Sequence, residues 1–277
     1  VGGDYWKFGI GFPITLLVIL VICSKYFHYK PYLKILILLL ISAVNILLNF
    51  RSLGGICLLV ALLFLANRLN FFRIYRSNKY CKSTSKILIL SILVLSTSYC
   101  LHGGYSFFAA NGYLGDDARE KYQSQSSGDF GVSSLAIIDS PVLGHGSWAR
   151  DNKYAMQLPG LLLDLGYKNI QPSINYEQGL DDLIPTHSYL LGAWVYSGFA
   201  GAFFWAYIFV LGIKAISREV IRFNNLNVLY AFILLNMIWN ILFSPLGAEA
   251  RLYSAFSLAV LVNILMRYDV NRAKYEY

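Results

Sequence analysis

Long runs of apolar residues alternate with shorter polar segments along the whole chain. A helix of about 20 apolar residues crosses the roughly 30 Å hydrocarbon core of a bilayer. Seven runs approach that length, the third being short and the fifth long: residues 8–27, 32–50, 53–66, 87–101, 189–216, 228–243 and 252–266. This pattern predicts an all-α polytopic membrane protein with about seven transmembrane helices.

One polar segment is much longer than the others. Residues 102–186 separate the fourth predicted span from the fifth, so the chain divides into 1–101 with four spans, the large loop, and 187–277 with three spans and a tail. A connection of this length is either functional or disordered. Apolar positions within 133–138 and 156–165 favour order, and we expect the second to form a short amphipathic helix on the membrane surface.

The composition and the distribution of charge agree with this topology. Only 14% of residues are charged and 57% are apolar, whereas soluble domains carry about 25% charged residues. Alternate loops and the tail hold fifteen basic and three acidic residues, and the opposite side holds eight basic and twelve acidic ones. The positive-inside rule assigns the first side to the cytoplasm and makes the large loop extracytoplasmic.

The net charge of +8 therefore indicates membrane topology and contact with anionic head groups, and nucleic-acid binding is disfavoured. We also expect the chain, which begins at Val1, to be the C-terminal part of a longer membrane protein. Its four cysteines have no paired spacing, and no metal-binding, nucleotide-binding or dinucleotide-binding motif is present in the sequence. The sequence predicts chemistry without a metal or cofactor.

The candidate catalytic residue is His187, which lies where the large loop re-enters the membrane. Histidine is the usual general base near neutral pH. The alternative is a purely structural histidine at a helix start, with Thr186 or Ser188 as the N-cap. His145, between two glycines, is a second candidate, and its alternative role is a hydrogen bond within the loop.

Four arginines on the predicted outer side could bind a phosphate group, because guanidinium presents a planar fork of donors to phosphate oxygens. These four are Arg51, Arg150, Arg119 and Arg251. In the same order, their structural alternatives are snorkelling to the interface, pairing with Asp151, a place on a charged surface helix, and capping of an external turn.

Three segments resemble the bacterial O-antigen ligase and O-antigen polymerase superfamily. They are Ile138-Asp-Ser-Pro-Val-Leu-Gly-His-Gly146, then Pro185-Thr-His-Ser-Tyr-Leu190 before a glycine-spaced helix, and Asn49-Phe-Arg-Ser-Leu-Gly-Gly55 between two helices. Their order, spacing and topology carry the resemblance, which covers most of this chain as the C-terminal half of a larger protein. By motif, His187 matches the family's loop histidine and Arg51 matches its arginine between helices.

The resemblance implies a metal-independent, inverting glycosyltransferase of polysaccharide and lipopolysaccharide biosynthesis in the bacterial cytoplasmic membrane. The donor would be a glycan linked to undecaprenyl diphosphate, and the acceptor either a lipid A core sugar or another lipid-linked glycan. Relatives often carry a further arginine upstream of the Asp-Ser-Pro-like segment, which residues 126–134 lack. Either Arg119 or Arg150 substitutes for it, or the activity is impaired.

Two other classes of function stay open. One is a transporter or flippase for lipid-linked polysaccharide, which is expected to carry ionisable groups inside its spans. The predicted span interiors contain neutral polar residues such as Asn45, Asn236 and Asn240, which disfavours transport. The other class is a non-catalytic assembly or sensor protein.

Overall fold

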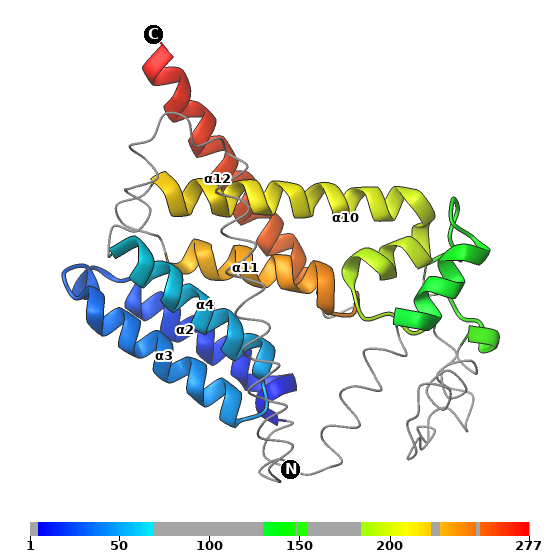
Figure 1. Cartoon of the computed structure of the whole chain (residues 1–277), viewed down its shortest axis with the longest axis horizontal. Helices are drawn as coiled ribbons and strands as arrows, with labels where there is room; N and C mark the ends of the chain where they lie inside the picture. Colours follow the sequence, from blue (N-terminus) through cyan, green and yellow to red (C-terminus); the bar gives the residue numbers. More distant parts are fainter. Residues whose placement is uncertain are drawn as a thin grey trace. The chain divides into compact units, whose positions relative to one another are not determined.

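The computed structural model describes residues 5–68, 130–147, 149–154, 184–222, 228–247 and 250–276 (Figure 1). The regular elements in these ranges are helices. They are η1 (Trp6–Ile10), α2 (Gly11–Ile22), η2 (Lys25–Phe27), α3 (Pro31–Leu47), α4 (Arg51–Arg68), a helix over Phe130–Asp139, α10 (Tyr189–Arg222), α11 (Val228–Phe243) and α12 (Ala250–Glu276).

Three of the described helices are long and apolar enough to cross a membrane: Arg51–Arg68, Tyr189–Glu219 and Ala250–Arg267. The apolar helices α2, α3 and α11 are shorter, and at about 1.5 Å per residue they extend roughly 18, 26 and 24 Å. The predicted all-helical class is therefore confirmed, and the helices are those of a membrane protein. The fourth predicted span, residues 87–101, lies outside the described residues.

The chain divides into two compact units. One contains Val1–Gly103, Leu211–Met237 and Phe256–Tyr277, and the other contains Gly104–Val210 and Ile238–Ala255. Helices α10, α11 and α12 each contribute residues to both units.

In the first unit, α3 and α4 form an antiparallel hairpin through a three-residue turn. Asn49 takes a left-handed conformation with φ of 62°, which asparagine tolerates better than most residues and which commonly ends a helix. The Phe50 N–H donates to the Asn45 carbonyl at 2.7 Å and closes the turn. Gly54 lets the helices approach closely, since a Cβ there would lie 2.9 Å from the Ser42 carbonyl oxygen.

A buried polar network joins η1, α2 and α3. The Asn45 side chain accepts a hydrogen bond from Trp6 Nε1 at 2.9 Å and donates to Thr15 Oγ1 at 3.0 Å and to the Ile41 carbonyl at 2.9 Å. Thr15 in turn donates to the Gly11 carbonyl at 2.8 Å. Because Asn45 and Thr15 are fully buried, these bonds replace water that neither side chain can reach.

We predict that Asn45→Ala destabilises the protein by about 1–3 kcal/mol, because the Trp6 indole N–H loses its acceptor. Asn263→Ala is the matched control, since Asn263 is an exposed helical asparagine of the same unit. Thermal unfolding in detergent measures both. Equal midpoints for the two variants would contradict a stabilising role for the network.

Candidate functional site

Helix α10 is broken at Gly198, and the chain reverses there. Gly198 has φ of 60° and ψ of −148°, which is not helical. The rings of Tyr189 and Trp205, one on each side of the break, pack edge to face with centroids 5.1 Å apart. A Cβ on Gly201 would overlap the Ala193 carbonyl oxygen. The two arms, residues 189–197 and 199–222, thus form the α10 hairpin (Figure 1).

The fifth predicted span, residues 189–216, coincides with the candidate span Tyr189–Glu219, but this run is not one continuous helix because it is broken at Gly198. The apolar run is long because it contains both arms of a hairpin. The small residues of this run allow close packing between the two arms and around Gly192, whose Cβ would lie 3.0 Å from Thr186 Oγ1.

The turn over residues 142–146 supplies the hydrogen bonds that α10 loses at its break. In an unbroken helix the Phe199 N–H would donate to the Val195 carbonyl. Instead Phe199 donates to the Val142 carbonyl at 3.2 Å, and Val195 accepts from the His145 N–H at 2.7 Å. The Tyr196 carbonyl accepts from the Gly146 N–H at 3.1 Å. We call this set of contacts the tip clamp.

Two glycines make the tip clamp possible. A Cβ on Gly198 would overlap the Val142 carbonyl oxygen, and a Cβ on Gly144 would lie 2.5 Å from the Gly198 nitrogen. Both residues have positive φ, 60° and 72°, a region that glycine occupies without steric cost. The Gly-His-Gly motif therefore serves a close backbone approach.

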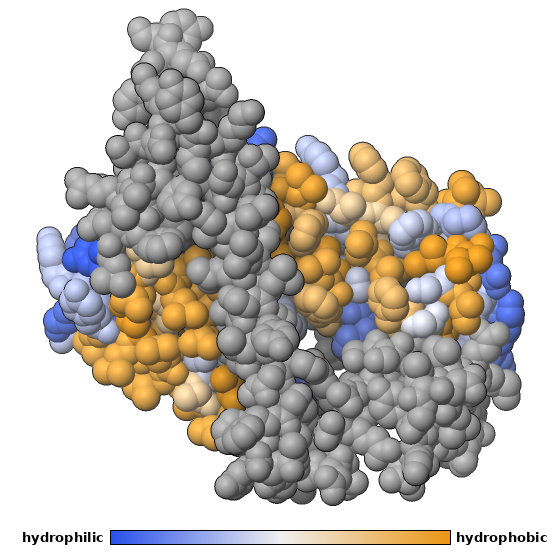
Figure 2. Space-filling view, in the orientation of Figure 1, coloured by the Kyte–Doolittle hydropathy of each residue, from blue (hydrophilic) through white to orange (hydrophobic). Residues whose placement is uncertain are grey.

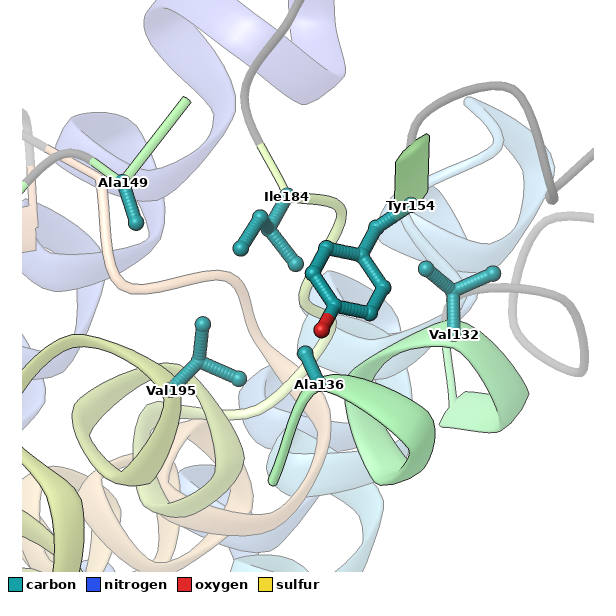
Figure 3. Packing of buried hydrophobic residues seen from close by; sticks show 6 residues of the cluster. All are labelled: Val132, Ala136, Ala149, Tyr154, Ile184 and Val195. Carbon is teal, nitrogen blue, oxygen red and sulfur yellow. The ribbon is translucent and has the colours of Figure 1, made fainter. Parts of the chain in front are cut away.

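A small hydrophobic core lies beside the tip clamp. Its members come from the helix Phe130–Asp139, from residues 149–154, from the chain before α10 and from the short arm of α10, as Figure 3 shows: Val132, Ala136, Ala149, Tyr154, Ile184 and Val195. The Ile184 N–H donates to the Ala149 carbonyl at 3.1 Å, and Ser133 Oγ donates to the Pro185 carbonyl at 3.0 Å. These bonds hold the chain segment that leads into His187.

A charged cluster covers the edge of this core. Asp139 Oδ2 accepts hydrogen bonds from Lys153 Nζ at 2.7 Å and from the Tyr154 hydroxyl. His145 packs its ring edge to face on Tyr154, with centroids 5.3 Å apart. His145 Nε2 lies 2.7 Å from the Ala136 carbonyl oxygen, and since a carbonyl only accepts, this nitrogen is the donor. His145 thus makes a hydrogen bond within the loop, which is the structural role that the sequence analysis gave as the alternative to a functional one.

The pKa values of the cluster follow from these contacts. Hydrogen bonds from Lys153 and Tyr154 lower the pKa of Asp139, and the bond to Asp139 raises the pKa of Lys153. Burial, followed by the bond to Asp139, raises the pKa of Tyr154. At neutral pH the cluster therefore holds an ionised carboxylate, a charged lysine and a neutral tyrosine.

The start of α10 packs on the turn between α11 and α12. Ser188 is the N-cap, because its Oγ accepts the Leu191 N–H at 3.2 Å, and the same hydroxyl donates to the Ile241 carbonyl of α11 at 2.8 Å. A Cβ on Gly192 would lie 3.4 Å from Leu246 Cβ, in the α11–α12 turn.

Two of the predicted site residues lie on these packed segments. His187 is half-buried and directly precedes the Ser188 cap, and Arg251 is an exposed residue in the first turn of α12. The structure therefore brings the segments that carry His187 and Arg251 together, at a place where α10 and α12 both begin and neither has an acidic residue in its first turn.

The other predicted residues lie elsewhere. His145 and the exposed Arg150 belong to the region of the charged cluster and small core, which bonds to the chain before His187. Arg51 is the first residue of α4, after the α3–α4 turn where the sequence predicts it, and it belongs to the first compact unit. Arg119 lies outside the described residues.

The sequence did not predict the roles of Gly198, Asp139 and Tyr154. The glycines at positions 144 and 198 are the signal in the sequence that could have indicated the tip clamp. The spacing of Asp139 and Tyr154 does not indicate that these two side chains are in contact. Across the described ranges no group of three or more His, Cys, Asp or Glu residues is arranged to hold a metal ion. Searches against protein-family models, curated proteins and solved structures find no match for the chain.

We predict that Gly198→Ala lowers the free energy of unfolding by about 2–4 kcal/mol, since the new Cβ meets backbone and is strained at positive φ. Gly247→Ala is the matched control, because a Cβ there meets nothing within 4 Å. Thermal unfolding in detergent compares them. A Gly198→Ala protein as stable as the control would contradict the tip clamp.

The charged cluster predicts a specific pH dependence. The pKa of Asp139 is lower in the folded protein than the usual value of about 3.9, so its contribution to stability is present above that value and is lost as pH falls through the folded pKa. We expect wild type to be more stable than Asp139→Ala at pH 6, and the difference to shrink below about pH 4. Thermal unfolding from pH 6 to pH 3 measures it, and a constant difference would refute the assignment.

Proposed function

We propose that the chain is part of a bacterial membrane glycosyltransferase of the O-antigen ligase or polymerase type. It transfers glycan from an undecaprenyl-diphosphate-linked donor to a lipid A core sugar or to another lipid-linked glycan. The reaction takes place on the outer side of the cytoplasmic membrane, in a protein with a large extracytoplasmic loop. The observation that carries the proposal is the packing of the segment that follows His187 on α11 and on the α11–α12 turn, which leads into the first turn of α12 with Arg251.

Two features of this region support diphosphate binding, although the acidic residue Glu249 directly precedes α12 in the sequence. Two helices begin there, and the partial positive charge of a helix N-terminus favours an anion. Neither α10 nor α12 has an acidic residue in its first turn. Arg251 adds a guanidinium whose donors match phosphate oxygens. Arg150, Arg119 and, by its motif, Arg51 stay candidates for binding the diphosphate or the acceptor.

The proposed step is a single displacement. A hydroxyl oxygen of the acceptor attacks the anomeric carbon of the donor sugar, and its proton passes to the His187 imidazole. The bond between the anomeric carbon and the phosphate oxygen breaks, and its electron pair leaves with the lipid diphosphate. Configuration at the anomeric carbon is inverted. Fixed cations stabilise the charge that grows on the leaving group, and His187 raises the nucleophilicity of a weak hydroxyl.

One observation favours the alternative of a transporter or flippase for lipid-linked polysaccharide. Glu219, at the end of the candidate span in α10, is buried with 6% of its surface exposed, and its Oε2 has no hydrogen-bond partner within the described part of the chain. The sequence predicts only neutral polar groups inside the spans. Ionisable groups buried inside spans are typical of transport pathways, and Glu219 lies at the end of its span.

The test uses the full-length protein in proteoliposomes with a lipid-linked donor and each acceptor in turn. We predict that His187→Ala slows glycan transfer by about 10²–10⁴-fold, the usual contribution of a general base. His187→Gln keeps a polar side chain and should be equally slow if the base is required. His28→Ala is the matched control, since His28 is an exposed histidine in the α2–α3 turn of the first unit.

Unchanged transfer by His187→Ala, at normal folded yield, would exclude His187 as the base. Absence of any transferred product from wild type with a competent donor would instead count against the glycosyltransferase. Translocation of the donor that is lost in Glu219→Gln would then support the transporter.

A further inference from the structure

The helix Phe130–Asp139 is apolar on two opposite faces. One face is buried in the small core through Val132 and Ala136. The other carries Phe130, Leu135 and Ile138, all of them exposed, and Ile138 has 71% of its surface accessible. Ser134 lies between Phe130 and Ile138 on this outer face and donates its hydroxyl to the Phe130 carbonyl at 2.8 Å, so its polar group is bonded to the helix itself. A helix on the surface of an aqueous loop usually carries more polar residues outward.

The turn that follows extends this exposed apolar face. Val142 and Leu143 are 70% and 83% exposed, although the backbone of the same turn is held in the tip clamp. Trp194 Nε1 donates to the Pro141 carbonyl at 2.9 Å, so an indole ring lies beside this turn. Tryptophan is enriched where a membrane meets water.

The apolar face continues directly onto α10. The Val142 carbonyl accepts the Phe199 N–H, and from Phe199 a row of stacked rings runs down one side of the long arm. Ring centroids lie 6.3 Å apart for Phe199 and Phe203 and 6.5 Å apart for Phe203 and Tyr207, and all three side chains are exposed. Figure 2 shows hydrophobic surface along the visible part of α10 and beside its break.

Charged and polar groups lie next to this face. The Asp139–Lys153 ion pair has about half of each side chain exposed, 46% and 58%, and Ser147, shortly after the turn, is exposed as well. An exposed apolar area that continues the surface of a membrane-spanning helix and ends in charged groups is typical of a segment at the membrane interface.

We propose that the helix Phe130–Asp139 and the turn over residues 140–143 are seated in the membrane interface, with lipid acyl chains covering Leu135, Ile138, Val142 and Leu143. This placement goes beyond the sequence-based expectation, in which residues 102–186 form an extracytoplasmic loop and only residues 156–165 of it lie on the membrane surface. It does not depend on the proposed glycosyl transfer, because only the membrane location of α10 is required.

The test places a single environment-sensitive fluorophore at each side of the proposed boundary. In a background with Cys23, Cys57, Cys81 and Cys100 replaced by serine, Ile138→Cys and Leu143→Cys report on the apolar face, and Ser147→Cys is the matched control. Each full-length variant is labelled with nitrobenzoxadiazole and reconstituted in nanodiscs. Quenching is measured with doxyl-labelled lipid and with aqueous iodide.

We expect labels at positions 138 and 143 to emit at shorter wavelength, to be quenched by doxyl lipid, and to be quenched several-fold less by iodide than the label at position 147. Equal iodide quenching at all three positions would place the face in water and overturn the proposal. Protection from both quenchers would mean that protein covers the face, either another part of the chain or a second copy, and would also overturn it. Two separate reporter positions guard against a local effect of one substitution.

Discussion

The α10 hairpin depends on the hydrogen bonds that the turn over residues 142–146 supplies at Gly198. A break in a membrane helix leaves carbonyl and N–H groups without partners, and lipid cannot replace them as water would. Here the groups of Val195, Tyr196 and Phe199 are bonded to the turn. The reversal, the small core beside it and the location of the chain before α10 all follow from this exchange of backbone bonds.

The hairpin changes how His187 is related to the membrane helices. His187 precedes the short arm, whose first ring, Tyr189, packs on Trp205. Trp205 lies seven residues beyond the break, or about 10 Å along the long arm. The sequence suggested that His187 lies at the outer end of a straight span. In the structure it instead precedes the short arm of the hairpin. In the proposed reaction the base therefore lies away from the hairpin tip and near the α11–α12 turn, which leads into the first turn of α12 with Arg251.

The first unit contains two kinds of buried polar group, and Asn45 and Glu219 are the examples. In the first unit the Asn45 network joins η1, α2 and α3, and its donors and acceptors satisfy one another in a buried environment. Glu219 is the exception within the described residues, since its buried Oε2 lacks a hydrogen-bond partner. A satisfied network stabilises a fold, whereas a buried carboxylate oxygen without a hydrogen bond costs free energy and is retained for another reason. That contrast keeps the transport alternative open.

The helices themselves could be predicted from the sequence, because long apolar runs in a membrane must satisfy their backbone internally. Ser188 was one of the two residues predicted to cap the start of the helix after the large loop, and Arg51 was predicted to follow the turn between two helices. Local residue preferences determine both positions. The path of residues 189–222 could not be predicted, because a glycine in an apolar run is compatible with a straight helix and with a reversal. Only the tertiary structure decides between them, since the bonds that stabilise the reversal come from the distant turn around Gly144.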